Sequence, residues 1–109
     1  LGTDSLASVP TLDLWDEMRG CLAAHRGRVT PADVLAMATL GGGRALGLAD
    51  RVGSLEVGKR ADLIAVSARG IGASDPVESL IAETGGGDVL VSLVEGEVRH
   101  RRLEGVVCA

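Results

Sequence analysis

The sequence predicts an α+β fold in which helices come first and a small β-unit follows. Apolar residues recur at helical spacing in the first 50 positions, whereas apolar and β-branched runs separated by turn residues prevail from Val52 onward. The length of 109 residues gives room for one small domain, and 46% hydrophobic residues are enough for a core. Trp15 is the only aromatic residue, so we expect a core of Leu, Val, Ile and Ala.

The first predicted helix runs from Thr11 to Arg26. Pro10 before it and Gly27 after it are suitable start and stop signals. Its predicted buried face carries apolar side chains at the i, i+4, i+7 and i+8 positions, which are Leu14, Met18, Cys21 and Leu22.

A second helix is predicted to begin at Thr30-Pro31. Thr30 can cap it, Pro31 suits the first helical position, and Asp33 favours the positive end of the helix dipole. The apolar residues that continue it towards the glycine cluster at 41–43 are Val34, Leu35, Met37 and Ala38. We expect a further short helical turn at 45–47 that ends on Gly47 as a cap.

The segment that follows has the spacing of a phosphate-binding loop, G-x-x-x-x-G-K, at Gly53, Gly58 and Lys59. Such a loop needs a Ser or Thr after the lysine, a buried strand before the first glycine and a helix at the lysine. Arg60 stands after the lysine, and no apolar run precedes Gly53. A nucleotide site is therefore disfavoured.

The same residues fit a β-hairpin better. Leu55 and Val57 alternate with polar residues, which is the period of a half-buried strand. We predict a strand at 54–57, a turn at 58–60 and a second strand at 63–67.

The remaining chain is predicted to hold one helix and a hairpin. After a loop at 68–75, the helix covers Pro76–Glu83 with Val77, Leu80 and Ile81 on one face, and the glycines at 85–87 end it. The strand segments are Asp88–Val94, a return from Val98 after a turn at Glu95-Gly96, and a last short strand at Val106-Val107.

Composition and charge exclude several function classes. The net charge of −4 argues against a nucleic-acid partner, and the basic run Arg99–Arg102 is interpreted as a solvated strand edge or hairpin turn. Cys21 and Cys108 lack metal-type spacing, so we expect reduced thiols and a cytoplasmic protein. No apolar run approaches the roughly 18 residues of a membrane span, and no signal peptide is recognised. The start at Leu1 is what we expect of a piece of a longer protein.

Several segments, in this order, resemble the C-terminal part of the metal-dependent amidohydrolase superfamily. The resemblance is to its deaminase and chlorohydrolase branch, which includes guanine deaminase-like and adenosylhomocysteine deaminase-like enzymes. The matching segments are LGTDS at 1–5, LDLWDEMR at 12–19, the run from Ala45 to Val66 with GSLEVGKRADL, DPVESLI at 75–81 and VSLVEGEVR at 91–99.

The resemblance implies a (β/α)8 barrel with a small β-sandwich built from both chain ends. Residues 1–50 would then be the mostly helical C-terminal end of the barrel, comprising the end of the last strand and the helices after it. Residues 51–109 would be part of the sandwich, with one inserted helix at 77–83.

The resemblance also implies the site. Asp4 would be the catalytic aspartate, which ligates a divalent metal (zinc or iron) and accepts a proton from the metal-bound water. Ser5 would orient Asp4 or a bound small-molecule substrate. A metal lowers the pKa of its water to about 7, and a neighbouring carboxylate can pass the proton to the leaving nitrogen. Taken alone, without the other motifs, Thr3-Asp4-Ser5 is more typical of a turn or a helix cap than of a metal site.

The other metal ligands of the superfamily, an H-x-H pair and two further histidines, have no counterpart in this chain. His25 and His100 stand in no such motif, and both are predicted to lie on the surface. Because a catalytic zinc needs three or more protein ligands, we expect no metal to bind this chain alone.

Two functions follow from these observations. In the first, the chain is the C-terminal part of an amidohydrolase that hydrolyses a C–N bond in a cyclic amidine or amide, as a deaminase does; its partner is the rest of the barrel, and the isolated chain is inactive. In the second, it is a non-catalytic β-module for packing or oligomer assembly. A homo-oligomer is expected, because without the barrel the apolar helix faces of Leu14, Met18 and Leu22 would lose their partner and stay exposed.

Overall fold

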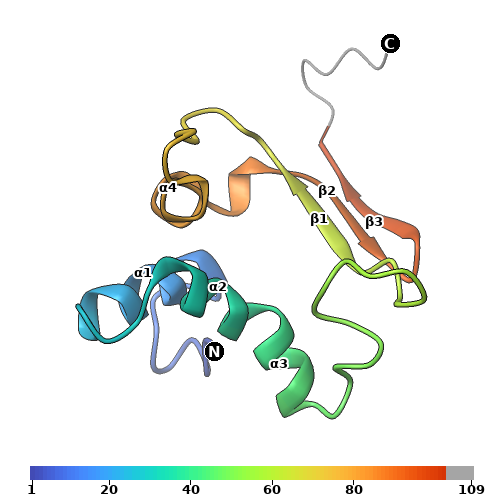
Figure 1. The fold of residues 1–109 in the computed structure, drawn as a ribbon, viewed down its shortest axis with the longest axis horizontal. Helices are drawn as coiled ribbons and strands as arrows, with labels where there is room; N and C mark the ends of the chain where they lie inside the picture. The colour runs from blue at the N-terminus through green and yellow to red at the C-terminus, as the bar shows by residue number, and fades with distance from the viewer. Residues whose placement is uncertain (103–109) are drawn as a thin grey trace.

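The computed structural model describes residues 1–102 and confirms the α+β class, with helices grouped on one side and an antiparallel sheet on the other (Figure 1). In chain order the elements are α1 (Leu14–Ala24), α2 (Pro31–Ala38), α3 (Leu40–Ala45), β1 (Leu63–Val66), α4 (Pro76–Glu83), the short 3-10 helix η1 (Gly86–Asp88), β2 (Val89–Val94) and β3 (Glu97–Arg101). Cys108 and the predicted strand at Val106-Val107 lie outside the described residues.

Helix α1 begins and ends inside its predicted bounds of Thr11 and Arg26. Asp13 caps it, since the side chain of Asp13 accepts a hydrogen bond from the Trp15 backbone N–H. The predicted buried face is partly right. Met18 is buried and both Cys21 and Leu22 pack against the core, whereas Trp15 takes the place expected for Leu14.

Helix α2 begins as predicted. Thr30 accepts a hydrogen bond from the Asp33 backbone N–H, and the Asp33 carboxylate accepts one from the Thr30 backbone, which together form a capping box. The glycine cluster does not simply end this helix, because Gly41–Gly43 form the body of α3. Gly43 is buried there, and a β-carbon on it would lie 3.2 Å from the Val52 carbonyl oxygen, so the loop packs closely on α3.

The predicted cap at Gly47 is confirmed. Gly47 has a φ of +70° and follows directly after the C-cap residue Leu46. Its N–H donates to the Arg44 carbonyl, and the Leu48 N–H donates to the Gly43 carbonyl at 2.8 Å. This pair of bonds is a Schellman motif and satisfies the last carbonyls of α3.

The core is small and lies between α1, α2 and α4. Among residues 1–102, the buried apolar side chains are Trp15, Met18, Val34 and Ile81. The predicted face of α4 is confirmed, because Val77 and Leu80 pack beside Ile81. The side chains of Met18 and Leu22 on α1 therefore pack against the core inside the chain.

The sheet has the order β1-β2-β3, and both neighbouring pairs are antiparallel. Leu93 pairs with Leu63 on one side and with Val98 on the other. The predicted hairpin turn is confirmed: Glu95 and Gly96 have φ values of +54° and +81°, as a two-residue type I′ turn requires. β3 is an edge strand whose residues are all exposed, in agreement with the interpretation of its basic run.

The predicted strand at 54–57 is wrong. Leu55 and Val57 are exposed and belong to an irregular loop, and β1 pairs with β2 instead. The loop closes through a hydrogen bond of 2.8 Å from the Arg60 N–H to the Arg51 carbonyl. Alternation of apolar and polar residues is therefore not enough here, because no strand within residues 1–102 pairs with the segment.

The side chain of Lys59 stabilises this loop through contacts with three of its neighbours. Its ammonium group donates to the Ala49 carbonyl at 2.6 Å and to Ser54 Oγ at 2.7 Å, and lies 2.9 Å from a carboxylate oxygen of Glu56. The Lys59 side chain is only 12% exposed. The lysine of the apparent phosphate-binding motif is thus engaged with its own loop, and a strand rather than a helix follows it.

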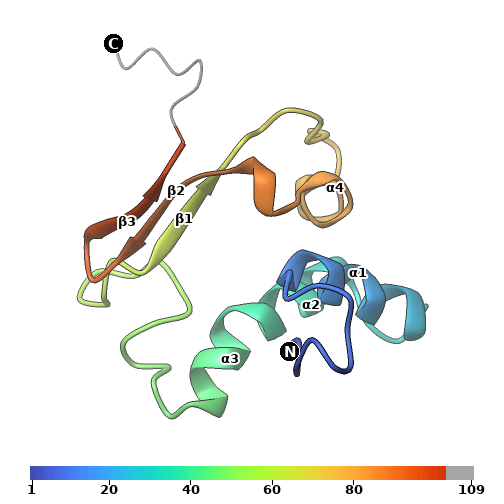
Figure 2. The same cartoon turned by 180° about the vertical axis from the view of Figure 1, so that it is seen from behind.

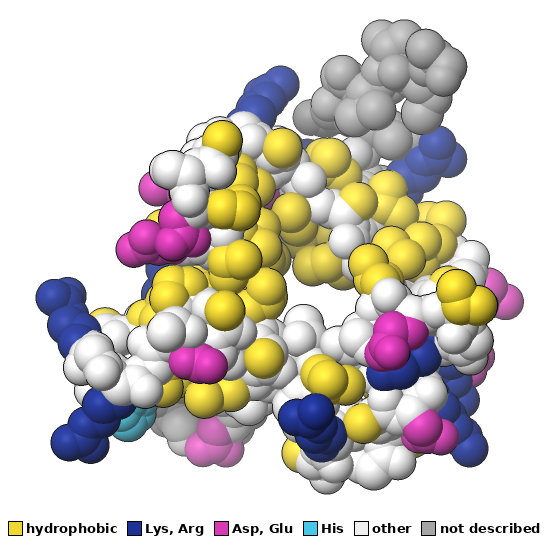
Figure 3. Space-filling view, in the orientation of Figure 1, with side chains coloured by type: hydrophobic (Ala, Val, Ile, Leu, Met, Phe, Trp, Pro, Cys, Tyr) yellow, Lys and Arg dark blue, Asp and Glu magenta, His cyan; other side chains and the backbone are white. Residues whose placement is uncertain are grey.

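A cleft of about 480 Å³ separates the helices from the sheet. It is bordered by the end of α2, the loop at 52–55 and the adjoining parts of β1 and β2. Figure 3 shows hydrophobic side chains around this hollow, and Figure 2 shows from behind how α3 and the three strands lie on either side of the connecting loop. Ile64 and Val94, which line the cleft, are 53% and 44% exposed.

None of the helices in residues 1–102 is long and apolar enough to cross a membrane.

We predict that Ile81→Ala lowers the free energy of unfolding by about 2–5 kcal/mol, because it leaves a void in a core with few members. Ile64→Ala is the matched control. Ile64 is 53% exposed, so its truncation costs less than about 1 kcal/mol. Urea denaturation followed by far-UV circular dichroism measures both. Equal losses for the two variants would contradict the described core.

We predict that Gly53→Ala is more destabilising than Gly58→Ala. Both glycines have a φ of +94°, so both substitutions carry the left-handed penalty of about 1–2 kcal/mol. A β-carbon on Gly53 would also lie 2.7 Å from Leu40 Cα, whereas one on Gly58 meets nothing within 4 Å. The difference in unfolding free energy between the variants, about 1–3 kcal/mol, isolates the close approach. A Gly58→Ala variant as unstable as Gly53→Ala would contradict it.

Candidate functional site

Asp4 lies in an irregular segment that precedes α1, and its side chain is exposed. Its φ of +61° is uncommon for a residue other than glycine, although aspartate tolerates this region better than most. Immediately after it, the N–H groups of Ser8 and Val9 donate to the Ser5 carbonyl at 2.9 and 3.1 Å. The backbone of Ser5 therefore fixes a turn that presents Asp4 to solvent.

The described residues do not build a metal site. No group of three or more His, Cys, Asp or Glu side chains comes together within residues 1–102. As predicted, His25 and His100 are exposed. The backbone of His25 caps α1, and the ring of His100 lies 3.3 Å from the Val89 carbonyl on the sheet. The described residues thus do not fit a divalent metal by themselves.

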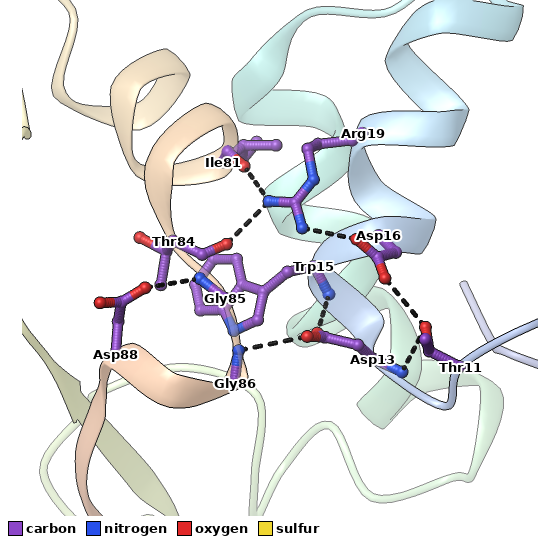
Figure 4. Close-up of polar contacts among 10 residues, drawn as sticks. All are labelled: Thr11, Asp13, Trp15, Asp16, Arg19, Ile81, Thr84, Gly85, Gly86 and Asp88. Atoms are coloured by element: carbon purple, nitrogen blue, oxygen red, sulfur yellow. Dashed lines mark hydrogen bonds and ion pairs between the residues drawn. The ribbon is translucent and has the colours of Figure 1, made fainter.

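The segment that carries Asp4 is tied to α1 by a chain of polar contacts (Figure 4). Thr11 Oγ1 donates to Asp16 Oδ2 at 2.8 Å, and Asp16 Oδ1 accepts a charged hydrogen bond of 2.7 Å from Arg19. Arg19 then donates to the carbonyls of Ile81 and Thr84 at 2.8 and 2.7 Å. The chain of contacts ends at the last turn of α4, beside the core.

Asp13 makes a second link to the same region. One carboxylate oxygen accepts the Trp15 N–H at 2.9 Å, and the other accepts the Gly86 N–H at 3.1 Å. Gly86 lies in η1, where Asp88 accepts the Gly85 N–H at 2.9 Å. Helix α1 and its cap are therefore joined to the end of α4 and the segment after it at two places, through Arg19 and through Asp13 (Figure 4).

These contacts keep Asp16 ionised. The hydrogen bond from Arg19 lowers the pKa of Asp16, and the hydroxyl of Thr11 lowers it further. The pKa values of two other carboxylates are lowered for local reasons: hydrogen bonds from Thr30 stabilise the Asp33 carboxylate, and Ser54 and then Lys59 stabilise that of Glu56. A lowered pKa suits an ion pair or a helix cap and not a proton donor near neutral pH.

The contacts of Arg19 with the end of α4 were not predicted. The i, i+3 spacing of Asp16 and Arg19 is a visible signal for an ion pair on one helix face. Nothing in the sequence shows that the same guanidinium reaches carbonyl oxygens 62 and 65 residues further along the chain. The placement of Asp4 and Ser5 as site residues rests on the resemblance.

Comparison with known proteins gives consistent matches. The amidohydrolase family model matches residues 1–99. A 5-methylthioadenosine/S-adenosylhomocysteine deaminase from Syntrophobacter fumaroxidans is 40% identical over 114 residues, covering 94% of this chain and 26% of its own length. An S-triazine hydrolase from Gordonia rubripertincta is 34% identical over 110 residues, covering 93% of this chain and 23% of its own length.

A solved structure matches as well. The crystal structure of an adenosine deaminase from Xanthomonas campestris with bound zinc aligns with a TM-score of 0.83 and 35% identity, covering 92% of this chain and 25% of that one. The chain thus spans about a quarter of the length of these relatives.

We predict that the contacts of Asp16 make the fold sensitive to acid. Because the pKa of Asp16 is lower in the folded state than the usual value of about 3.9, its stabilisation is present above that value and is lost as the pH falls through the folded-state pKa. The unfolding free energy of the wild type should therefore fall more steeply between about pH 5 and pH 3 than that of Asp16→Asn. Urea denaturation across this range measures both slopes, and identical slopes would contradict the ion pair.

Proposed function

The chain belongs to the amidohydrolase family, and we propose from this premise that it is the C-terminal part of a longer hydrolytic deaminase. The longer enzyme would hydrolyse a C–N bond in a cyclic amidine or amide and release ammonia. The observation that carries the proposal is the TM-score of 0.83 and 35% identity with a deaminase over 92% of the chain. The deaminase relative that is 40% identical over 94% of the chain supports it.

The proposed place of this chain in the longer enzyme follows the architecture implied by the resemblance. Residues 1–50 would complete a (β/α)8 barrel, and residues 51–109 would form part of a small β-sandwich. The open cleft supports this, because a three-stranded sheet with exposed apolar residues such as Ile64 and Val94 gains stability when further protein covers it. The partner in this proposal is the remainder of the barrel.

Asp4 is the residue of this chain to which the proposal assigns chemistry. Its exposed carboxylate sits on a turn with an uncommon backbone conformation, and such outliers motivate a functional hypothesis. A carboxylate can ligate zinc or iron and can hold a proton during C–N hydrolysis. The remaining ligands have to come from the longer protein, since residues 1–102 do not gather them.

Ser5 has a supporting part in the proposal. Its carbonyl accepts the two N–H groups that close the turn after Asp4, so its backbone fixes the direction of the chain at this point. Its hydroxyl is exposed and would orient Asp4 or a bound substrate.

We predict that the isolated chain of 109 residues binds no stoichiometric zinc and releases no ammonia from adenosine-type nucleosides. The longer protein that contains it should do both. Elemental analysis of the purified proteins and an ammonia-release assay measure these properties. Turnover by the isolated chain with one zinc per molecule would overturn the proposal.

In the longer protein, Asp4→Asn should lower kcat by about 10²–10⁴-fold, the range associated with positioned proton transfer. Asp50→Asn is the control, because Asp50 is also exposed and has only a 3.8 Å contact with its neighbour Arg51. An Asp4→Asn enzyme as active as Asp50→Asn would show that Asp4 carries no chemistry.

A further inference from the structure

Residues 46–62 lead from α3 to β1 as one irregular stretch, which we call the connector. Its first part packs closely on α3. A β-carbon on Gly53 would lie 2.7 Å from Leu40 Cα. One on Gly43 of α3 would lie 3.2 Å from the Val52 carbonyl oxygen. Glycine permits an approach this close because it has no β-carbon, so the connector is fixed against α3 at positions 52 and 53.

The side chain of Lys59 joins the start of the connector to its end. A lysine ammonium has three N–H donors. This one has three oxygen partners, which are the Ala49 carbonyl at 2.6 Å, Ser54 Oγ at 2.7 Å and a carboxylate oxygen of Glu56 at 2.9 Å. Beside it, the Arg60 N–H donates to the Arg51 carbonyl at 2.8 Å. The ammonium is therefore saturated by the connector itself, and the connector is closed by bonds that cross it.

The last residues of the connector hold the turn between β2 and β3. The Glu95 N–H donates to Asp62 Oδ1 at 2.7 Å. The Gly96 N–H donates to the Ala61 carbonyl at 3.1 Å. The Glu95 carboxylate also lies 3.1 Å from the guanidinium of Arg60. Three consecutive residues, 60–62, thus bind this turn at three points.

The opposite end of the sheet is attached separately. Val66, the last residue of β1, packs against the core, and the Ser67 N–H donates to the Asp88 carbonyl at 2.9 Å. Figure 1 shows the connector reaching the end at which β1 begins, away from the end that continues towards α4. Because one end of the sheet is held at the core, the contacts of the connector determine the direction in which the sheet extends from it.

We propose that the connector is a rigid spacer between α3 and the β2–β3 turn, and that Lys59 keeps it rigid. Lys59 binds Ser54, which follows the residues packed on α3, and directly precedes the residues that bind the turn. A movement of the turn relative to α3 therefore has to break the Lys59 contacts or the contacts on either side of them. This role goes beyond the proposed deaminase function and does not depend on it.

Hydrogen exchange of single amides, measured by NMR on this chain, tests the spacer. Lys59→Met removes the ammonium and keeps the length of the side chain. Arg51→Met is the control, because it removes a cation of the same connector whose ion-pair distance is 3.8 Å. Lys59→Met should raise the exchange rates of the Arg60 and Gly96 amides by about 10-fold or more, since loss of the charged contacts lets the connector open. The Thr84 amide at the end of α4 should be unchanged, and Arg51→Met should leave all three rates at wild-type values.

The pattern of the three amides decides the outcome. Faster exchange at Arg60 without a change at Gly96 would show that Lys59 stabilises only its own loop, and would overturn the spacer. Unchanged rates at both would overturn it as well, as would equal acceleration at Thr84, which reports opening of the whole fold. If Lys59→Met does not fold, Ser54→Ala takes its place. It removes one acceptor of the ammonium, and the same order of effects is required with a smaller increase.

Residual dipolar couplings of backbone N–H groups give a second readout, the orientation of the sheet relative to α1–α3. One alignment tensor should fit both parts in the wild type and in Arg51→Met. In Lys59→Met the sheet should need a separate tensor of smaller magnitude, because its direction is averaged by motion. A single tensor for Lys59→Met would contradict the spacer. In the longer protein, exchange of a peptide that covers residues 95–96 gives the same comparison. Because this readout needs no turnover, its failure is separable from failure of the proposed function.

Discussion

The arrangement of this chain depends on the guanidinium of Arg19. It lies on α1, pairs with Asp16 on the same helix, and donates to carbonyls at the C-terminal end of α4, 62 and 65 residues away in the sequence. Those carbonyls are among the groups that a helix end leaves without an internal partner. A planar guanidinium with several donors can satisfy them and a carboxylate together, which a lysine ammonium would do less well. This contact joins α1 to the end of α4. The Ile81 side chain lies in the core beside it.

The rest of the fold shows how little the chain can bury by itself. Its core among the described residues has four apolar side chains, and Val66 of β1 packs against that core. Elsewhere a cleft lies between the sheet and the helices (Figure 3). Small domains bury a smaller share of their surface than large ones and are correspondingly marginal. The chain spans about a quarter of the length of its relatives and leaves apolar sheet residues such as Ile64 and Val94 exposed.

Local signals in the sequence predicted the elements that local forces determine. The cap at Thr30, the cap at Gly47 and the turn at Glu95-Gly96 each need only a few neighbouring residues, and all three were predicted. The reciprocal bond from the Thr30 backbone to Asp33 that completes a capping box was not. The strand at 54–57 was predicted wrongly, because its period of two gives no information on whether a partner strand is present. The half-buried ammonium of Lys59 organises the segment as a loop instead. For the candidate site, Asp4 could be named only from family resemblance, and the long-range contacts of Arg19 have no sequence pattern at all.

The loop around Lys59 also connects the first three helices to the part of the chain that holds the sheet and α4. Lys59 is the one lysine in the sequence, so a lysine-specific protease has a single bond to cut, between Lys59 and Arg60. The cut divides α1–α3 from the sheet and α4, and its products would remain associated through Arg19 and the shared core. While the ammonium is enclosed by its own loop, the protease has to wait for the loop to open. The rate of cleavage at this one bond thus measures how often the loop around Lys59 opens.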